Sequence, residues 1–258
     1  MAHCNLLVDD VPVCCGPDAT LLEAITAAGA SVPTLCHHQS LLPVGACRMC
    51  VVEVAWPDGR TALVPSCSTP VADGLEVATR TSAVRRSHRL TLELLLTRAP
   101  QSPRIRDLAH QYGLVESRFP ALVPPDECVL CGLCVRVCAE QVGREAITFA
   151  RRSAERTVTA AFGRSSGDCF ACGSCVNLCP TGVLRFTDEG DRRRLTLGER
   201  LLSENRLERC AVCRRPFATR EFLDWVAERS GARADDLVCP SCARRYRAER
   251  MVRPLHAS

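Results

Sequence analysis

Cysteine is the residue type in this chain that most clearly could bind a metal or an inorganic cofactor. Nineteen of the 258 residues are cysteine, several times the usual share in a globular protein. The first residues, MAHCNLLVDD, place acids where an export signal needs an apolar run. We therefore expect a cytoplasmic protein. Because that compartment keeps thiols reduced, the cysteines favour metal binding over disulfides.

The strongest motif is a cysteine run of spacing C-x2-C-x2-C-x3-C that occurs twice. Three thiolates from one tight loop bind three irons of a cubane cluster, and in two-cluster ferredoxins the fourth cysteine of each run binds the other cluster. Structural zinc sites, the alternative, show paired CxxC knuckles instead of such triplets. We expect two [4Fe–4S] clusters, one on Cys128, Cys131, Cys134 and Cys179, the other on Cys169, Cys172, Cys175 and Cys138.

An earlier group, Cys36, Cys47, Cys50 and Cys67, has the spacing C-x10-C-x2-C-x16-C. It keeps the CxxC pair and the distant fourth cysteine of a [2Fe–2S] ferredoxin, although its first two cysteines lie farther apart than in the plant type. The sequence around them, PTLCHHQSLLPVGACRMCVVEV and then PSCSTPVADGLEV, resembles the N-terminal ferredoxin domain of the complex I large iron–sulfur subunit. The small diaphorase subunit of NAD-linked nickel–iron hydrogenases and NAD-dependent formate dehydrogenases share this module.

The resemblance covers about residues 1–190 and implies a β-grasp domain whose [2Fe–2S] cluster is held by the four cysteines of this group. Directly after the helix RRSHRLTLELLL, the family normally has a [4Fe–4S] site with one histidine and three cysteine ligands. Here the corresponding segment, TRAPQSPRIRDLAHQYGL, contains no cysteine. We expect that this cluster is missing and that its scaffold helices remain, with His88 and His110 as packing or surface residues. To pass from the [2Fe–2S] cluster to the two [4Fe–4S] clusters, electrons would then need either a cluster of a partner subunit or closer packing of the remaining domains.

Two CxxC pairs near the C-terminus form the last group, Cys210, Cys213, Cys239 and Cys242. Such paired knuckles suit tetrahedral zinc, although the spacer of 25 residues slightly exceeds the usual zinc-site window. A further [4Fe–4S] cluster and a mononuclear iron centre are the alternatives. Three early cysteines remain outside all groups and are expected to be plain thiols: Cys4, Cys14 and Cys15.

The elements that position these cysteines indicate an α+β chain in four parts. We expect a β-grasp [2Fe–2S] ferredoxin domain over 1–80, a helical linker over 81–125, a bacterial-type 2×[4Fe–4S] dicluster ferredoxin domain over 126–190, and a small four-cysteine zinc-type domain over 195–258. Short apolar runs between turn residues predict the strands Asn5–Val8, Val11–Cys15, Met49–Ala55, Thr61–Pro65 and Leu75–Thr79.

Helices are expected where apolar residues recur at helical spacing. Thr20 and Glu23 form a capping box for the first of them, and Pro100 and Pro103 are expected to end the second. A Pro-rich connector, Phe119–Pro125, leads into the cysteine runs. The predicted helices are Leu21–Ala28, Ser82–Arg98, Arg106–Tyr112, Leu197–Arg206 and Glu221–Arg229.

Motifs for substrate chemistry are missing from the sequence. No GxGxxG follows a strand, and a phosphate-binding P-loop is impossible because all 33 basic residues are arginine. These arginines form only short clusters and the net charge is +4, so we expect no nucleic-acid binding. No apolar stretch is long enough to span a membrane.

These observations and the resemblance together predict an electron-transfer subunit of a hetero-oligomeric oxidoreductase, with one [2Fe–2S], two [4Fe–4S] and one zinc. As partners the resemblance implies a flavoprotein NAD(P)-binding subunit and a large catalytic subunit, either a nickel–iron hydrogenase or a formate dehydrogenase. The alternatives are a free-standing ferredoxin-like carrier and a redox-responsive regulator that binds nucleic acid through the Arg-rich tail.

Overall fold

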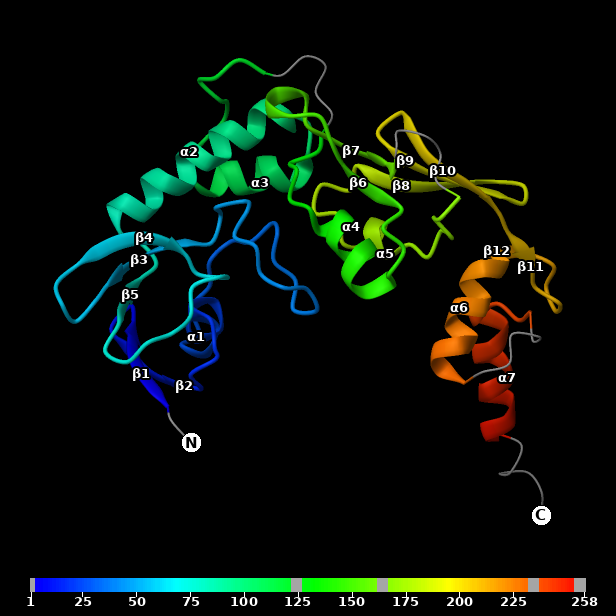
Figure 1. The fold of residues 1–258 in the computed structure, drawn as a ribbon, viewed down its shortest axis with the longest axis horizontal. Helices are drawn as coiled ribbons and strands as arrows, with labels where there is room; N and C mark the ends of the chain where they lie inside the picture. The colour runs from blue at the N-terminus through cyan, green and yellow to red at the C-terminus, as the bar shows by residue number, and fades with distance from the viewer. Residues whose placement is uncertain (1–2, 122–126, 162–166, 232–236, 253–258) are drawn as a thin grey trace.

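A computed structural model describes residues 3–121, 127–161, 167–231 and 237–252. The elements follow one another along the long axis of the molecule, from the N-terminal sheet at one end to the helices α6 and α7 at the other (Figure 1). The predicted connector Phe119–Pro125 lies mostly outside the described residues. No helix in the described ranges is long and apolar enough to cross a membrane.

The N-terminal unit is a five-stranded mixed sheet with the order β2-β1-β5-β3-β4, in which β1 and β5 are parallel. Asp9 and Asp10 form the two-residue turn between β1 and β2, both with positive φ, as a tight hairpin requires. All five predicted strands are confirmed within two residues at each end: β1 Cys4–Val8, β2 Val11–Cys15, β3 Val51–Ala55, β4 Thr61–Pro65 and β5 Glu76–Ala78.

The helix α1, Leu21–Ala27, covers one face of this sheet. Its predicted capping box is present, since the Thr20 side chain accepts from the Glu23 amide and the Glu23 carboxylate accepts from the Thr20 amide. Leu21 and Ile25 are fully buried against sheet residues such as Val54. This sheet with one covering helix is the β-grasp-like arrangement that we expected.

Two helices, α2 (Ser82–Arg98) and α3 (Pro103–Gln111), connect the sheet to the cysteine runs. We expected Pro103 to help end α2, but it begins α3 instead. Its fixed φ and missing N–H suit a first helical position. His88 is buried and its Nδ1 lies 2.9 Å from the Tyr112 hydroxyl, while His110 is exposed. Both histidines are thus the packing and surface residues that we expected.

The middle unit contains the eight cysteines of the repeated run. Two short helices, each starting at a glycine, lie beside a two-stranded and a three-stranded sheet. The elements are α4 Leu133–Arg136, the π-helical turn η1 Val137–Val142, β6 Ile147–Ala150, the 3-10 turn η2 Ser153–Glu155, β7 Thr157–Ala160, α5 Ser174–Asn177, β8 Leu184–Glu189, β9 Arg192–Leu197 and β10 Arg200–Arg206.

The predicted helix Leu197–Arg206 is wrong. Those residues begin with the end of β9, turn at Gly198 and Glu199, and return as β10, so that the sheet has the order β10-β9-β8. Gly198 has a φ of +58°, which suits a two-residue hairpin turn. The sheet therefore continues past residue 190, where we expected a boundary.

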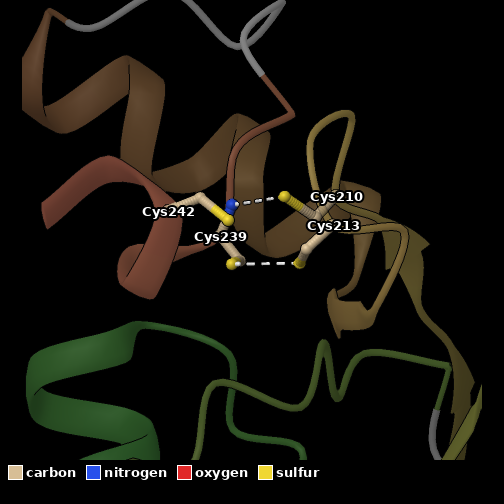
Figure 2. A group of neighbouring side chains, drawn as sticks. All are labelled: Cys210, Cys213, Cys239 and Cys242. Carbon is tan, nitrogen blue, oxygen red and sulfur yellow. Dashed lines mark hydrogen bonds between the residues drawn. The ribbon is translucent and has the colours of Figure 1, made fainter. Parts of the chain in front are cut away.

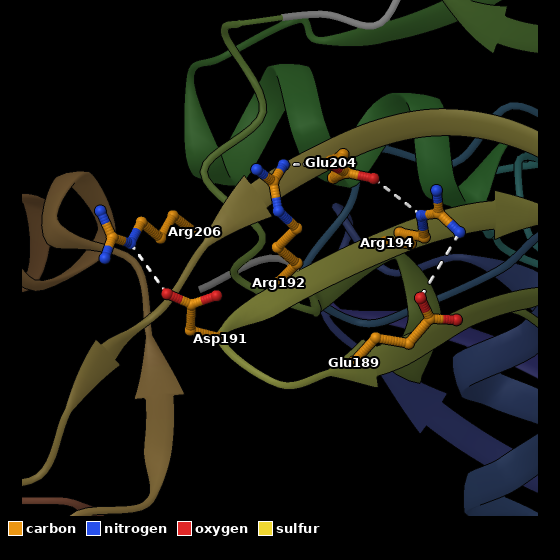
Figure 3. A network of polar contacts seen from close by, with 6 residues as sticks. All are labelled: Glu189, Asp191, Arg192, Arg194, Glu204 and Arg206. Carbon is orange, nitrogen blue, oxygen red and sulfur yellow. Dashed lines mark hydrogen bonds and ion pairs between the residues drawn. The ribbon is translucent and has the colours of Figure 1, made fainter.

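A row of ion pairs ties β9 to β10 on the solvent side (Figure 3). Glu204 accepts hydrogen bonds from both Arg192 and Arg194, and Arg206 donates to Asp191 at 2.9 Å. The short run DRRR, residues 191–194, therefore does not mark a domain boundary. Its arginines lie in β9, and Arg192 and Arg194 form ion pairs with Glu204 of the facing strand β10.

The C-terminal unit consists of a small hairpin and two helices. Its elements are β11 Glu208–Arg209, β12 Pro216–Ala218, α6 Arg220–Ser230 and α7 Pro240–Val252. The helix α6 confirms the prediction for Glu221–Arg229, with Thr219 as its N-cap. The helix α7 was not predicted, because its arginine-rich sequence shows no apolar periodicity.

Candidate metal centres

The four cysteines of the N-terminal unit converge in one buried site. Cys36, Cys47 and Cys50 come from the long loop between α1 and β3, and Cys67 follows β4. None of the four is more than 9% exposed. The Cys47 amide donates to Cys36 Sγ at 3.4 Å, and hydrogen bonds from the thiols of Cys47 and Cys67 lower the pKa of Cys36. The site therefore favours a thiolate at Cys36, whereas the hydrogen bonds to Cys36 and burial raise the pKa values of Cys47 and Cys67.

Gly45 lets the loop of this site close. Its φ is +59°, and a Cβ there would lie 2.9 Å from the Ser68 Oγ, closer than real Cβ contacts come. Ser66, directly before Cys67, is fully buried, and its hydroxyl donates to the Cys50 carbonyl at 2.8 Å. Glycine at this position thus allows the segment before Cys47 to pass close to the segment that carries Cys67.

The eight cysteines of the repeated run line two separate cavities. Each cavity contains three cysteines of one run and the fourth cysteine of the other run. The first is lined by Cys128, Cys131, Cys134 and Cys179. The second is lined by Cys138, Cys169, Cys172 and Cys175. The cavity linings thus group the cysteines in the way that the spacing predicts for two clusters, and the ligand sets themselves stay a prediction.

The two cysteine loops repeat each other in backbone conformation. Leu130 and Ala171, each directly before the second cysteine, have φ near +50°, and Gly132 and Gly173 both have left-handed φ and begin α4 and α5. A Cβ on Gly173 would lie 3.3 Å from the Phe186 ring. These left-handed residues curl each loop around its cavity, and glycine adopts such a conformation without strain.

Apart from the cysteines, the linings of both cavities are mainly apolar, with Thr181 in the first and Arg144 in the second. Burial raises the pKa of Cys131 to about 12 and raises the pKa of Cys134 and Cys175 as well. Four buried thiols without a cation would stay protonated, whereas a cationic cluster stabilises the thiolates that bind it. The donor set and the triplet spacing fit the iron–sulfur cluster that the motif predicts.

The N-terminal cysteine loop packs directly against the first cavity. Arg136, between the third and fourth cysteines of the first run, donates to the carbonyls of Leu42 at 2.7 Å and Cys36 at 3.0 Å. Gln141 donates to the Ser40 carbonyl at 2.6 Å. Cys36 and Cys131 share one apolar core, and the charge of Cys36 adds to burial in raising the pKa of Cys131. The two sites are neighbours.

Arg136 is not marked by any motif in the sequence. It contacts residues about a hundred positions earlier, and nothing in its local sequence indicates a partner at that distance. No motif marks Ser203 either, although its buried hydroxyl donates to Cys169 Sγ at 3.2 Å. Only the spatial arrangement reveals these two residues.

The C-terminal cysteines form a compact tetrad (Figure 2). Cys210 and Cys213 come from the turn between β11 and β12, and Cys239 and Cys242 come from the start of α7. All four Sγ atoms lie within 4.8 Å of one another. The Sγ atoms of Cys213 and Cys239 are 3.8 Å apart, which matches the edge of about 3.8 Å of a tetrahedron with metal–sulfur bonds of about 2.3 Å.

The backbone around Cys210 prepares it to bind as a thiolate. Hydrogen bonds from the amides of Cys213 and Cys239 lower the pKa of Cys210 to about 6. The Cys210 amide donates to the Arg215 carbonyl at 2.9 Å, closing the knuckle. A single metal ion fits these sulfurs better than a cubane, whose irons and sulfides must lie between the thiolates.

The three remaining cysteines lie on the N-terminal hairpin. Cys4 faces Cys15 across β1 and β2, and Cys14 is exposed. Among the described residues, only the C-terminal tetrad brings three or more metal-binding atoms this close together, so the hairpin thiols form no such group. That these three cysteines are plain thiols stays a prediction.

Comparisons with known proteins match both iron–sulfur parts of the chain. A model of the 2Fe-2S iron-sulfur cluster binding domain matches residues 2–82, and one of the 4Fe-4S dicluster domain matches residues 127–183. The crystal structure of an NAD+-reducing [NiFe]-hydrogenase in the H2-reduced state contains a chain that is 30% identical, with a TM-score of 0.61, over 70% of this chain and 86% of that one. This chain belongs to the iron–sulfur electron-transfer subunits of NAD(P)-linked oxidoreductases.

Longer relatives of this family share the same part of the chain. The NADPH-Fe(3+) oxidoreductase subunit alpha of Geobacter sulfurreducens is 31% identical over 203 residues, and an NADH-quinone oxidoreductase subunit of Rhizobium meliloti is 32% identical over 191. These matches cover 70% and 64% of this chain but only 24% and 22% of the relatives, so the chain spans about a quarter of their length. Neither family model reaches the C-terminal tetrad.

Proposed function

We propose that this chain relays electrons between a flavin-containing NAD(P) subunit and a catalytic subunit, by family resemblance a nickel–iron hydrogenase or a formate dehydrogenase. The observation that carries the proposal is the close succession of three thiol sites. The N-terminal site shares a core with the first cavity of the dicluster unit, and the second cavity draws its cysteines from the same two runs. No other subunit's cluster is then needed between the first two sites.

The proposed ligand sets follow the three groups. Cys36, Cys47, Cys50 and Cys67 hold a [2Fe–2S] cluster; Cys128, Cys131, Cys134 and Cys179 hold the first [4Fe–4S] cluster; Cys138, Cys169, Cys172 and Cys175 hold the second. Iron–sulfur clusters, when bound, supply reversible one-electron oxidation and reduction.

The chain's own contribution is to position these sites and keep water away from them. Apolar side chains such as Leu133, Val158 and Leu184 are buried around the cavities. Arg136 fixes the N-terminal loop against α4 through its two carbonyl contacts. Ser203 and the backbone amides donate to cysteine sulfurs, and such hydrogen bonds and burial set reduction potentials.

For the C-terminal tetrad we propose one structural zinc ion. The supporting observation is the spacing of the four sulfurs within 4.8 Å, which suits one tetrahedral ion. Mononuclear iron has the same ligand geometry, so metal analysis separates these two possibilities. The tetrad then stabilises a small unit that buries little apolar surface.

One anoxic purification of the full chain from its native host tests this function. We expect about ten irons and one zinc per chain from the ligand counts, together with a co-purifying flavoprotein and a large oxidoreductase subunit. Cys134→Ser is expected to lower the iron content, and Cys14→Ser, at an exposed thiol outside all groups, serves as the matched control. A chain that carries no iron, or that purifies with all its clusters but no partner, contradicts the proposed relay.

A further inference from the structure

The cysteine loop of the second cavity is held by contacts with the C-terminal unit as well as by contacts within the middle unit. Phe170, directly after Cys169, is 3% exposed. Its ring centroid lies 5.6 Å from those of both Phe222 and Trp225 on α6. On the other side Arg144 lies over the Phe170 ring, 4.9 Å from its centroid. Phe170 therefore anchors the cysteine loop in an aromatic cluster provided by α6.

Thr219 makes a second link between the two units. Its buried hydroxyl donates to the Phe170 carbonyl at 2.7 Å. The same oxygen accepts the Phe222 amide at 3.2 Å and so caps the N-terminus of α6. One side chain thus fixes both the start of α6 and the backbone of the cysteine loop.

The C-terminal tetrad lies a few residues from Thr219 along the chain. Cys210 and Cys213 occupy the turn between β11 and β12, and β12 ends at Ala218, directly before Thr219. The two halves of the tetrad are joined without a metal by few contacts, among them the Cys239 amide to Cys210 Sγ at 3.3 Å and the Ala211 amide to the Leu237 carbonyl at 2.7 Å. An ion bound by all four sulfurs would fix the hairpin, and with it the position of Thr219.

We propose that the C-terminal unit is a metal-dependent cap on the loop that carries Cys169, Cys172 and Cys175. Zinc bound to the tetrad holds the β11–β12 hairpin, the hairpin positions Thr219 and α6, and these restrain Phe170 and its loop. This inference rests on the proposed function in two respects, namely that the loop holds an iron–sulfur cluster and that the tetrad binds a metal ion. The linings of both cavities come from the dicluster unit, and the first loop is held from outside by α2, where Arg98 donates to the Cys128 carbonyl at 3.1 Å.

The pseudo-symmetry of the two loops supplies an internal control for the test. We would measure amide hydrogen exchange by mass spectrometry on the anoxic full chain and compare peptides covering 169–175 with peptides covering 128–134. Removing the tetrad metal with Cys213→Ser, at its exposed cysteine, is expected to raise exchange several-fold in 169–175 and to leave 128–134 unchanged. Cys14→Ser is the matched control.

Thr219 is tested separately, because a cysteine variant could unfold the tail as a whole. Thr219→Val removes the hydroxyl and is expected to raise exchange in 169–175, whereas Thr219→Ser restores the wild-type rate. Thr187→Val, on the exposed face of β8, is the control. Equal changes in both loops, or no change in either, overturn the cap. A wild-type chain without iron would instead overturn the proposed function, and metal analysis of the same sample distinguishes the two results.

Discussion

Ser203 gives the second cavity a buried hydroxyl that donates to a cysteine sulfur. The residue is 1% exposed on β10, its hydroxyl donates to Cys169 Sγ at 3.2 Å, and its oxygen accepts from the Asn205 side chain at 3.3 Å. The Asn205 contact orients the hydroxyl hydrogen towards sulfur. Such a bond stabilises the more negative, reduced state of a cluster and raises its reduction potential.

Replacing Ser203 by alanine is therefore expected to lower the midpoint potential of the second [4Fe–4S] cluster. Redox titration followed by EPR measures this shift, and the potential of the [2Fe–2S] site in the same sample is the control. Ser203→Thr keeps the hydroxyl and is expected to stay close to wild type. An unchanged potential in Ser203→Ala, with full iron content, contradicts a role of Ser203 in setting it.

Sequence spacing found the cysteines of the sites but not the residues that support them. So many cysteines in one chain indicate metal binding, and a loop with three closely spaced cysteines is typical of a [4Fe–4S] cluster. Arg136, Ser203 and Thr219 are ordinary polar residues whose partners lie 34 to 100 positions away. Only the fold brings them to those partners, so no local pattern marks them.

At the scale of elements, the β9–β10 hairpin shows where the sequence was misleading. Leucines in 195–202 fit a helical spacing as well as a hairpin, and Gly198 in a presumed helix was the contrary signal. In the structure Leu195 and Leu197 alternate with more exposed residues, as in a half-buried strand. The N-terminal strands were predictable because turn residues such as Asp9 and Asp10 bounded them on both sides.

Glu204 is expected to stabilise this hairpin in a pH-dependent way. Hydrogen bonds from Arg194 and Arg192 hold the pKa of Glu204 below its usual value. A carboxyl with a lowered pKa in the folded state contributes stability at neutral pH and loses it as the pH falls through that pKa. Glu204→Gln should therefore lower the Tm slightly at pH 7 and low salt, and the difference should disappear in acid.

Thermal denaturation at several pH values and salt concentrations checks this prediction. Because Glu204 and both arginines are at the surface, salt should reduce the effect. Glu199→Gln, an exposed change in the adjacent turn, is the matched control. A Tm difference that persists unchanged in acid or in high salt would show that Glu204 acts through packing and not through its charge.

At the scale of the whole molecule, the sites follow the long axis. The N-terminal site adjoins the first cavity through Arg136, and the second cavity adjoins the C-terminal unit through Phe170. A relay with one end at the β-grasp-like unit thus has its other end beside α6. A partner that exchanges electrons with the second cluster has to approach next to the C-terminal unit.

Arg136 is expected to be the main polar link between the first two units. Arg136→Met removes two hydrogen bonds from a charged donor and should cost about 1–3 kcal/mol in the free energy of unfolding. It should also raise hydrogen exchange at Leu42, whose carbonyl accepts one of these bonds. Arg152→Met, at an exposed arginine, is the control. Unchanged exchange in residues 37–44 would show that Arg136 does not hold this loop against α4.

The apolar core that contains both Cys36 and Cys131 also bears on how such proteins are assembled from genes. Separate family models match the two iron–sulfur parts. In this chain a fusion that transferred only one part would leave the other half of the shared core facing water. We therefore expect recombination to have moved the two as a pair, joined by α2 and α3, while the C-terminal tetrad could be gained or lost without exposing that core.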